Sequence, residues 1–234
     1  MMPPVLFPVA PVLIPVCRSN SHFQVRRIYC VGRNYAAHAR EMGGDPTREP
    51  PFFFQKPTDA IQVVLPGTIL EHAYPPMTAN YHHEVELVAA IGKGGRNIAA
   101  GTALDHVVGY AVGLDMTRRD LQRAMAEQKK PWEVGKSFDH GAIIGQLHLA
   151  SDIGHVALGA ITLTVNGQSR QSSDLAHMTW SVAEQVANLS QYYELFPGDI
   201  IYAGTPENVG PVVLGDLIVA TIAGLDEIHV RIVA

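Results

Sequence analysis

The stretch that decides the fold is residues 81–93, "YHHEVELVAAIGK", which combines the pattern of a β-strand with two carboxylates. Its second half is apolar and a glycine turn ends it, as is typical of a buried strand. Side chains alternate between the two faces of a strand, so Glu84 and Glu86 are expected on one face together with His82. Two like charges about 7 Å apart along one strand repel each other unless a cation or water compensates them.

A divalent metal is the simplest cation that would stabilise this carboxylate pair. Asp115 ends another apolar, glycine-containing strand, "HVVGYAVGLD", and strand ends are frequent positions of functional residues. Glu84, Glu86 and Asp115 would offer three oxygen ligands, the kind that Mg²⁺ or Mn²⁺ prefers, with waters completing the coordination. Two other interpretations fit the same residues. One is a solvated strand face without metal, and the other is a zinc-like site that includes His82.

A second candidate group is the pair His38 and Glu41 in the segment "NYAAHAREMGG", which Asn34 is expected to cap as a short helix. Side chains three residues apart share a helix face, so the carboxylate can hydrogen-bond the imidazole. Such a contact fixes the tautomer and raises the basicity of the imidazole, which suits removal of a proton from water. An ordinary pair on a helix surface has the same spacing.

Three further features suit an anionic ligand. Lys136 in "EVGKSFD" is a candidate for stabilising an oxyanion, or else a surface lysine. The loop "YAGTPENVGP" offers Thr205 and backbone N–H groups to a carboxylate, although a plain strand connection has the same composition. The guanidiniums of Arg33, Arg118 and Arg119 suit bidentate contacts with carboxylates, although most arginines are simply solvated.

The composition is that of one globular domain with a substantial core, because 47% of the 234 residues are hydrophobic and 17% are charged. The formal net charge is −5 without a basic stripe, so neither nucleic acid nor an anionic membrane is an expected partner. The apolar N-terminus is interrupted by prolines and lacks a charged start. We therefore expect an extended arm over residues 1–24 instead of a signal peptide or membrane span. Two cysteines without a Cys/His motif favour the reducing cytoplasm.

The remaining chain consists mainly of short apolar or alternating segments separated by Gly-Asp, Asn-Gly and Gly-Thr-Pro turns. Helices are expected over residues 117–130, ended by Pro131, and over 180–195, where Ser181 and Glu184 form a capping box. Strands are expected within residues 24–31, 52–55, 106–117, 161–171, 198–206, 215–224 and 227–233. The pattern predicts an α+β fold that is rich in strands and has a few peripheral helices.

Seven blocks, in order, resemble the fumarylacetoacetate hydrolase family: "CVGRNYAAHAREMG", "PFFFQKPTDAI", "YHHEVELVAAIGK", "GYAVGLDMTRRDLQ", "PWEVGKSFD", "LTVNG" and "LFPGDIIYAGTPENVGP". The resemblance extends from about residue 25 to the C-terminus. Within the family it is closest to the acylpyruvate hydrolases, such as those acting on fumarylpyruvate in gentisate breakdown. It implies a mixed β-sandwich or β-roll with peripheral helices, a single catalytic domain over residues 25–234, a homodimer, and one Mg²⁺ or Mn²⁺.

The resemblance also implies roles for particular residues. The metal ligands would be Glu84, Glu86 and Asp115, without His82 or His83. The implied catalytic residues are His38 and Glu41 as the water-activating pair, with Lys136 beside them. The residues expected to bind a small anionic 2-oxo acid are Arg33, Lys56, Arg119, Gln122, Gly204 and Thr205.

The activity implied by the resemblance is hydrolysis of a carbon–carbon bond in an acylpyruvate, with fumarylpyruvate giving fumarate and pyruvate. Decarboxylation of oxaloacetate, or tautomerisation of a keto acid, would pass through a similar enolate and is the alternative enzymatic interpretation. A metal-stabilised scaffold that binds a partner without turnover is the third.

Overall fold

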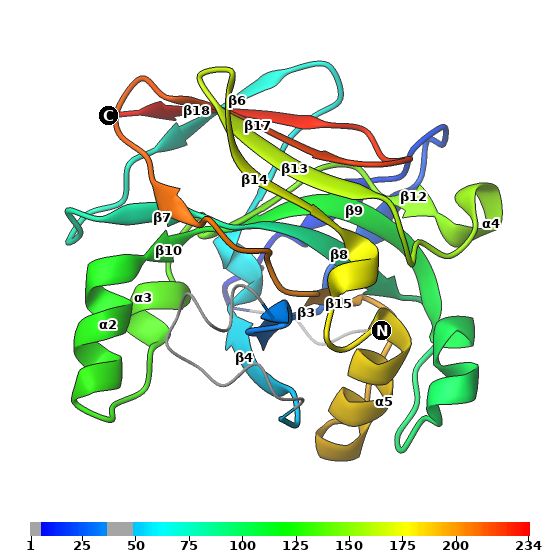
Figure 1. The fold of residues 1–234 in the computed structure, drawn as a ribbon. Coiled ribbons are helices and arrows are strands. Elements are labelled where there is room, and N and C mark those ends of the chain that lie inside the picture. The colour runs from blue at the N-terminus through cyan, green and yellow to red at the C-terminus, as the bar shows by residue number, and fades with distance from the viewer. Residues whose placement is uncertain (1–5, 37–48) are drawn as a thin grey trace.

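The computed structural model describes residues 6–36 and 49–234, and two stacked β-sheets form its centre (Figure 1). The eight strands of the larger sheet are, in chain order, β3 (Arg27–Gly32), β4 (Phe52–Lys56), β5 (Ile61–Val63), β8 (Val85–Ile91), β9 (Val107–Asp115), β11 (Ala142–Ile144), β12 (His148–Leu149) and β15 (Asp199–Tyr202). Their spatial order is β4-β3-β15-β8-β9-β11-β5, with β12 beside β9. Strand β8 is therefore central.

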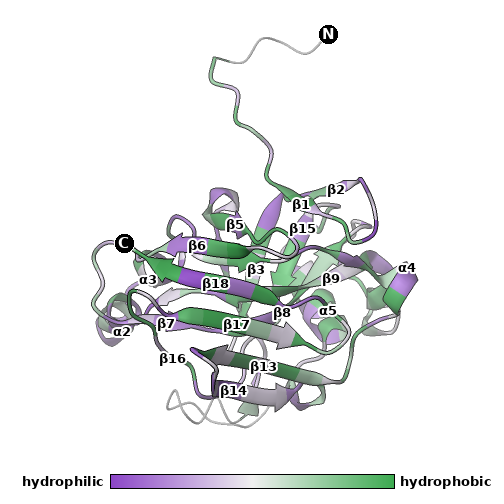
Figure 2. Ribbon diagram, turned by 90° about the horizontal axis from the view of Figure 1, so that it is seen from above, coloured by the Kyte–Doolittle hydropathy of each residue, from purple (hydrophilic) through white to green (hydrophobic). Residues whose placement is uncertain are grey.

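The smaller sheet covers one face of the larger sheet. Its five strands are β6 (Ile69–Ala73), β13 (Ala160–Val165), β14 (Gln168–Asp174), β17 (Leu217–Ile222) and β18 (Ile228–Val233). They lie side by side in the order β14-β13-β17-β18-β6, as the view from above shows (Figure 2). The Asn-Gly turn predicted within residues 161–171 connects β13 and β14.

Strand β8 is buried on both faces, which explains its nearly continuous apolar sequence. Leu87 and its neighbours on one face belong to the core shared with the smaller sheet, which also contains Leu163 and Val230. Val88, on the other face, belongs to a second core with Ile14. The two cores hold β8 and β9 rigidly between them.

The second core is covered by a small hairpin of β1 (Leu13–Pro15) and β2 (His22–Gln24), which lies within the segment expected as an arm. Its residue Ile14 is fully buried. Residues 6–11 extend away from the body of the molecule (Figure 2), and Leu6, Phe7 and Val9 are exposed.

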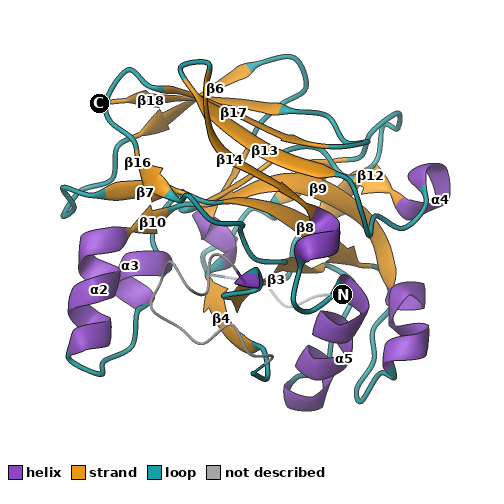
Figure 3. Ribbon diagram, in the orientation of Figure 1, coloured by secondary structure: helices purple, strands orange, loops and turns teal. Residues whose placement is uncertain are grey.

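The helices lie at the periphery (Figure 3). They are α2 (Arg119–Glu127), α3 (Glu133–Lys136), α4 (Ala150–Ile153) and α5 (Val182–Tyr192), with 3₁₀ turns η1 (Thr58–Ala60), η2 (Ala100–His106) and η3 (Leu175–His177). The predicted capping box of Ser181 and Glu184 is present at the start of α5. None of the helices described here is long and apolar enough to cross a membrane. The α+β, strand-rich fold predicted from the sequence is confirmed.

Two local predictions are wrong, for the same reason. The chain between residues 81 and 91 is not one strand: β7 (Tyr81–His83) belongs to a separate sheet in the order β10-β7-β16, and β8 begins after Glu84. The helix expected from residue 117 begins at Arg119, because Thr117–Arg118 form β10, which pairs with β7. The third strand, β16, is Gly210–Pro211. Pairing with distant segments overrides the local pattern in both places.

Candidate active site

The pairing of β8 with β9 brings the three acidic residues together. The backbone N–H of Asp115 donates to the carbonyl oxygen of Glu84 at 2.9 Å, and Glu86 lies opposite Gly113. All three carboxylates are buried, and each has an oxygen within 4.8 Å of the others. Glu84 just before β8, Glu86 on β8 and Asp115 at the end of β9 thus form one cluster, which we call the carboxylate cluster.

Lys136, at the end of α3, connects two members of the carboxylate cluster. Its Nζ donates to Glu84 Oε2 and to Asp115 Oδ2, both at 2.7 Å. The other oxygen of Glu84 accepts a hydrogen bond from Arg119 Nη2. Glu86 Oε2 accepts one from the backbone N–H of Gly204 at 2.7 Å.

Lys56 approaches the carboxylate cluster from the opposite side of Asp115. Its Nζ lies 2.8 Å from Asp115 Oδ1, but its three N–H donors go to the carbonyl oxygens of Met116, Lys136 and Gly141. Asp115 Oδ1 therefore has the lysine charge nearby and no hydrogen bond within the described part of the chain. A buried carboxylate oxygen without a donor is suited to a metal ion, and an all-oxygen cluster suits Mg²⁺ or Mn²⁺ better than zinc.

The electrostatics of the carboxylate cluster show how its neighbouring negative charges are stabilised. Burial raises the pKa of Glu86 well above its usual range, and the charges of Asp115 and Glu84 raise it further. Burial lowers the pKa of Lys136, but the neighbouring carboxylates of Asp115 and Glu84 outweigh this effect and raise it. Arg119, Lys136 and Lys56 compensate Glu84 and Asp115, whereas Glu86 forms no ion pair within the described part of the chain, so its ionised form requires further positive charge. A divalent cation would supply that charge.

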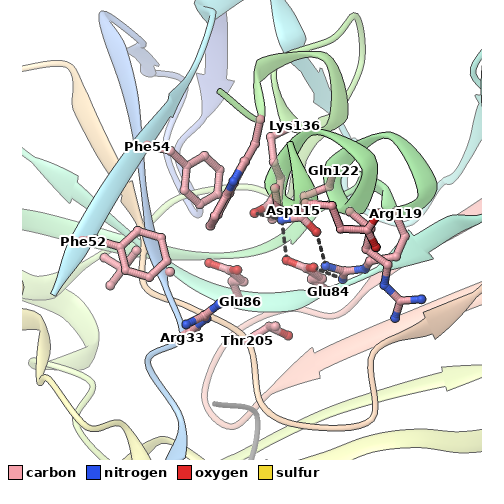
Figure 4. Close-up of a pocket in the computed structure, with 16 residues that line it drawn as sticks. Arg33, Phe52, Phe54, Glu84, Glu86, Asp115, Arg119, Gln122, Lys136 and Thr205 are labelled. Atoms are coloured by element: carbon pink, nitrogen blue, oxygen red, sulfur yellow. Dashed lines mark hydrogen bonds and ion pairs between the residues drawn. The ribbon is translucent and has the colours of Figure 1, made fainter. Parts of the chain in front are cut away.

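The carboxylate cluster lies in a cavity of about 270 Å³ (Figure 4). Its lining combines acidic, basic and aromatic side chains. Besides the carboxylate cluster, these include Arg33, Phe52, Phe54, Arg119, Gln122, Arg123, Glu127, Trp132, Lys136 and Thr205. Phe52 meets Trp132 edge to face, with ring centroids 5.6 Å apart, so one wall of the cavity is aromatic.

Not every residue expected to bind a ligand reaches this cavity. Arg33, Arg119, Gln122 and Thr205 line it, whereas Lys56 and Gly204 are not among the lining residues. The Lys56 ammonium is held by backbone carbonyl groups, and the Gly204 N–H is bonded to Glu86.

Of three other predicted residues, one lies outside the cavity lining and two lie outside the described part of the chain. The guanidinium of Arg118 lies 4.3 Å from the ring centroid of Phe138, and the side chain is not part of the cavity lining. His38 and Glu41, with most of the helix expected after Asn34, lie outside the described residues. The side chain of Asn34 itself bonds to backbone groups of Trp180 and Ala203.

Arg123 is a cavity residue that the sequence analysis missed. It follows Arg119 by four residues on α2, so both side chains lie on the same helix face. That spacing was the signal that could have revealed it. Among the described residues no ion pair involves Arg123 or Arg33, so both guanidiniums are available to an anionic ligand.

His82 is not part of the carboxylate cluster. Its Nε2 contacts Asn80 Oδ1 at 2.8 Å, and its Nδ1 accepts a hydrogen bond from Arg119 Nε at 3.4 Å. Burial, together with the charge of Arg119, lowers the pKa of His82 to about 3. A neutral His82 therefore supports the arginine that pairs with Glu84.

A second group of potential ligands, Cys17, His148 and Asp226, comes together only in the folded chain. His148 Nε2 accepts a hydrogen bond from the backbone N–H of Asp226 at 3.2 Å, and the Asp226 carboxylate accepts one from Gln146. Asp226 is largely exposed. This group has a single carboxylate, which is exposed, so it lacks the buried all-oxygen ligand set by which the carboxylate cluster suits Mg²⁺ or Mn²⁺.

The family model for the fumarylacetoacetate (FAA) hydrolase C-terminal domain matches residues 27–233. The chain belongs to this family, as its sequence blocks predicted. The crystal structure of fumarylpyruvate hydrolase from Pseudomonas aeruginosa in complex with Mn²⁺ and pyruvate is 57% identical to it, with a TM-score of 0.97. The similarity covers 98% of this chain and 99% of that one.

Two curated relatives show the range of activities among similar chains. Fumarylpyruvate hydrolase from Ralstonia sp. is 44% identical over 192 residues, which cover 80% of this chain and 95% of the relative. The mitochondrial oxaloacetate tautomerase FAHD1 of Arabidopsis thaliana is 38% identical over 206 residues, covering 88% and 90%. Hydrolysis and tautomerisation are thus both found close to this sequence.

Proposed function

We propose that this protein is a metal-dependent hydrolase that converts fumarylpyruvate and water into fumarate and pyruvate. The observation that carries the proposal is the buried carboxylate cluster in a cavity that also contains Arg33 and Arg123, neither of which forms an ion pair with another described residue. Support comes from the 57% identical fumarylpyruvate hydrolase that binds Mn²⁺ and pyruvate.

Glu84, Glu86 and Asp115 are the proposed ligands of a Mg²⁺ or Mn²⁺ ion. Asp115 Oδ1 fits this role because it is buried and accepts no hydrogen bond from the described residues. When bound, such an ion polarises the oxygens of a 2-oxo acid and stabilises the negative charge that develops as the carbon–carbon bond breaks.

The other cavity residues are proposed to bind the two ends of the substrate. Thr205 and Gln122 line the same cavity as the carboxylate cluster and are proposed to bind the 2-oxo acid end, while the guanidiniums of Arg33 and Arg123 suit the distal carboxylate of the fumaryl group. Two N–H donors of Lys136 go to Glu84 and Asp115, and the third is proposed to stabilise an oxyanion.

The proposed hydrolysis begins when His38, oriented by Glu41, removes a proton from water. The hydroxide adds to the distal carbonyl carbon, and Lys136 stabilises the resulting alkoxide. Collapse of this adduct breaks the carbon–carbon bond and gives fumarate and the enolate of pyruvate. Protonation of the enolate carbon then gives pyruvate. His38 and Glu41 enter on the family resemblance alone, since they lie outside the described residues.

A second candidate function is tautomerisation or decarboxylation of oxaloacetate. The 38% identical oxaloacetate tautomerase favours it, and the same ligands would stabilise the same type of enolate. The two fumarylpyruvate hydrolases are more similar to this chain than that tautomerase is, at 57% and 44% identity. That difference favours the hydrolase.

The test is to strip the purified protein with a chelator, restore Mg²⁺ or Mn²⁺, and follow fumarylpyruvate and oxaloacetate in parallel. We expect metal-dependent release of equal amounts of fumarate and pyruvate from fumarylpyruvate. A metal-dependent reaction confined to oxaloacetate would reject the hydrolase in favour of the second candidate. If removal of the metal lowers the melting temperature but neither compound is consumed, the protein is a binding scaffold.

The proposal also includes the setting of the reaction. We propose that the reaction is a step of gentisate breakdown in the cytoplasm. The enzyme would be a homodimer, and each chain would have one catalytic domain over residues 25–234 and an arm over residues 1–24. Light scattering after gel filtration tests the dimer, because a monomeric mass would contradict it.

A further inference from the structure

Gln171 on β14 connects the smaller sheet to the candidate active site. The side chain is fully buried, although glutamine is normally an exposed residue. Such a residue is retained only when its amide is well hydrogen-bonded. Its partners come from β7, from the start of β8 and from the loop after β15.

The oxygen of the Gln171 amide holds the backbone beside the carboxylate cluster. Oε1 accepts a hydrogen bond from the backbone N–H of Val85 at 3.1 Å and contacts His83 Nδ1 at 3.0 Å. Since Oε1 is only an acceptor, His83 Nδ1 is the donor in this contact. Val85 lies between Glu84 and Glu86, so Gln171 anchors the peptide that separates two proposed ligands.

The nitrogen of the same amide holds the loop that contains Thr205. Nε2 donates to Thr205 Oγ1 and to the carbonyl oxygen of Pro206, both at 2.9 Å. Turning the amide over would place its NH₂ group against the N–H of Val85 and its oxygen against a carbonyl oxygen. The observed orientation is therefore the only one that satisfies all these groups.

This arrangement determines what the Thr205 hydroxyl can do. Because Oγ1 accepts from Gln171, the hydroxyl hydrogen must point away from Gln171, and Thr205 lines the cavity. We infer that Gln171 is a positioning residue that directs the Thr205 hydroxyl hydrogen at an oxygen of the bound 2-oxo acid. The inference rests on the proposed function, because it uses the same cavity and the same class of ligand.

A double-mutant cycle of Gln171→Met and Thr205→Val tests this role. The probe is pyruvate, titrated calorimetrically in the presence of saturating Mn²⁺, and KM for fumarylpyruvate is measured alongside. Thr205→Val removes a hydrogen bond to an anion, so we expect pyruvate to bind roughly tenfold or more weakly. Gln171→Met frees the hydroxyl to rotate, and a severalfold weakening is expected. The double variant should bind pyruvate no more weakly than Thr205→Val alone.

A purely structural role for Gln171 would give a different result. Gln171→Met leaves buried backbone groups unsatisfied and will lower the melting temperature in any case. The matched control is Ser190→Ala, which removes a buried side chain that bonds to the backbone of Ile98 and Ala187, away from the cavity. It should lower the melting temperature without changing the affinity for pyruvate. If Gln171→Met does not fold, Gln171→Asn replaces it, because its shorter amide cannot reach both sides.

Two outcomes would overturn this inference but not the proposed function. In one, the Gln171 variant binds pyruvate as tightly as the parent protein. In the other, the losses of binding free energy in the two single variants add fully in the double variant. Failure of the parent protein to bind pyruvate with Mn²⁺ or to consume fumarylpyruvate would overturn the proposed function, and this inference with it.

Discussion

Replacing Lys56 with methionine tests how the carboxylate cluster is held in place. From the sequence, Lys56 is a candidate for binding a substrate carboxylate, whereas in the structure its ammonium binds the carbonyl oxygens of Met116, Lys136 and Gly141 and lies 2.8 Å from Asp115 Oδ1. Methionine fills a similar volume but provides neither donors nor charge. The variant should therefore lose stability before it loses substrate affinity.

The size of this loss follows from the contacts of Lys56. Removing one partner of a buried ion pair costs about 3–5 kcal/mol, and each buried carbonyl group left without a donor costs about 1–3 kcal/mol. These costs overlap, and Gly141 keeps a hydrogen bond from the backbone N–H of Met116. We expect a total of about 4 kcal/mol. In a chain of this length each kcal/mol lowers the melting temperature by about 2–4 °C, so the expected decrease is about 8–16 °C.

The assay is thermal unfolding followed by circular dichroism, with KM for fumarylpyruvate measured well below the transition. Lys93→Met is the matched control, since Lys93 is exposed, and its melting temperature should stay near that of the parent protein. A Lys56→Met protein that melts like the parent but shows a raised KM would refute the reasoning. That result would instead support a role of Lys56 in binding the substrate.

Three further predictions concern the metal, the distal carboxylate and the response to acid. Asp115→Asn should weaken Mn²⁺ binding at least about tenfold in calorimetric titration, and unchanged affinity would exclude Asp115 as a ligand. Arg123→Ala should raise KM for fumarylpyruvate but not for acetylpyruvate, whose acyl group is uncharged. An equal increase in both KM values would exclude Arg123 from binding the distal carboxylate. Burial lowers the pKa of His72 to about 4 from an ordinary 6.5, so the unfolded chain takes up this proton first as the pH falls. The contribution of His72 to stability is therefore present above pH 6.5 and lost between about pH 6.5 and 4. The free energy of unfolding, measured by urea titration, should fall less steeply with decreasing pH in His72→Gln than in the parent protein. An identical decrease in both would contradict the assignment.

Local patterns predicted most of the strands because their causes are local. Alternation and the Asn-Gly turn indicated the hairpin of β13 and β14, and the Ser181–Glu184 capping box marked the start of α5. The prediction failed at Glu84, where the chain passes from one sheet to another. Which sheet a strand joins depends on partners far along the chain, and hydrophobic periodicity does not contain that information.

The sequence by itself identified Glu84 and Glu86 as candidate metal ligands, because two carboxylates on one face of an apolar strand are unusual and a cation is the simplest way to stabilise them. Only the tertiary structure decided which cations meet them and in what role. Lys56 is buried beside Asp115, Arg119 pairs with Glu84, and Arg123 lines the cavity without an ion pair to another described residue. These contacts join residues far apart in the chain, so they depend on strand register and helix placement, which are products of the whole fold.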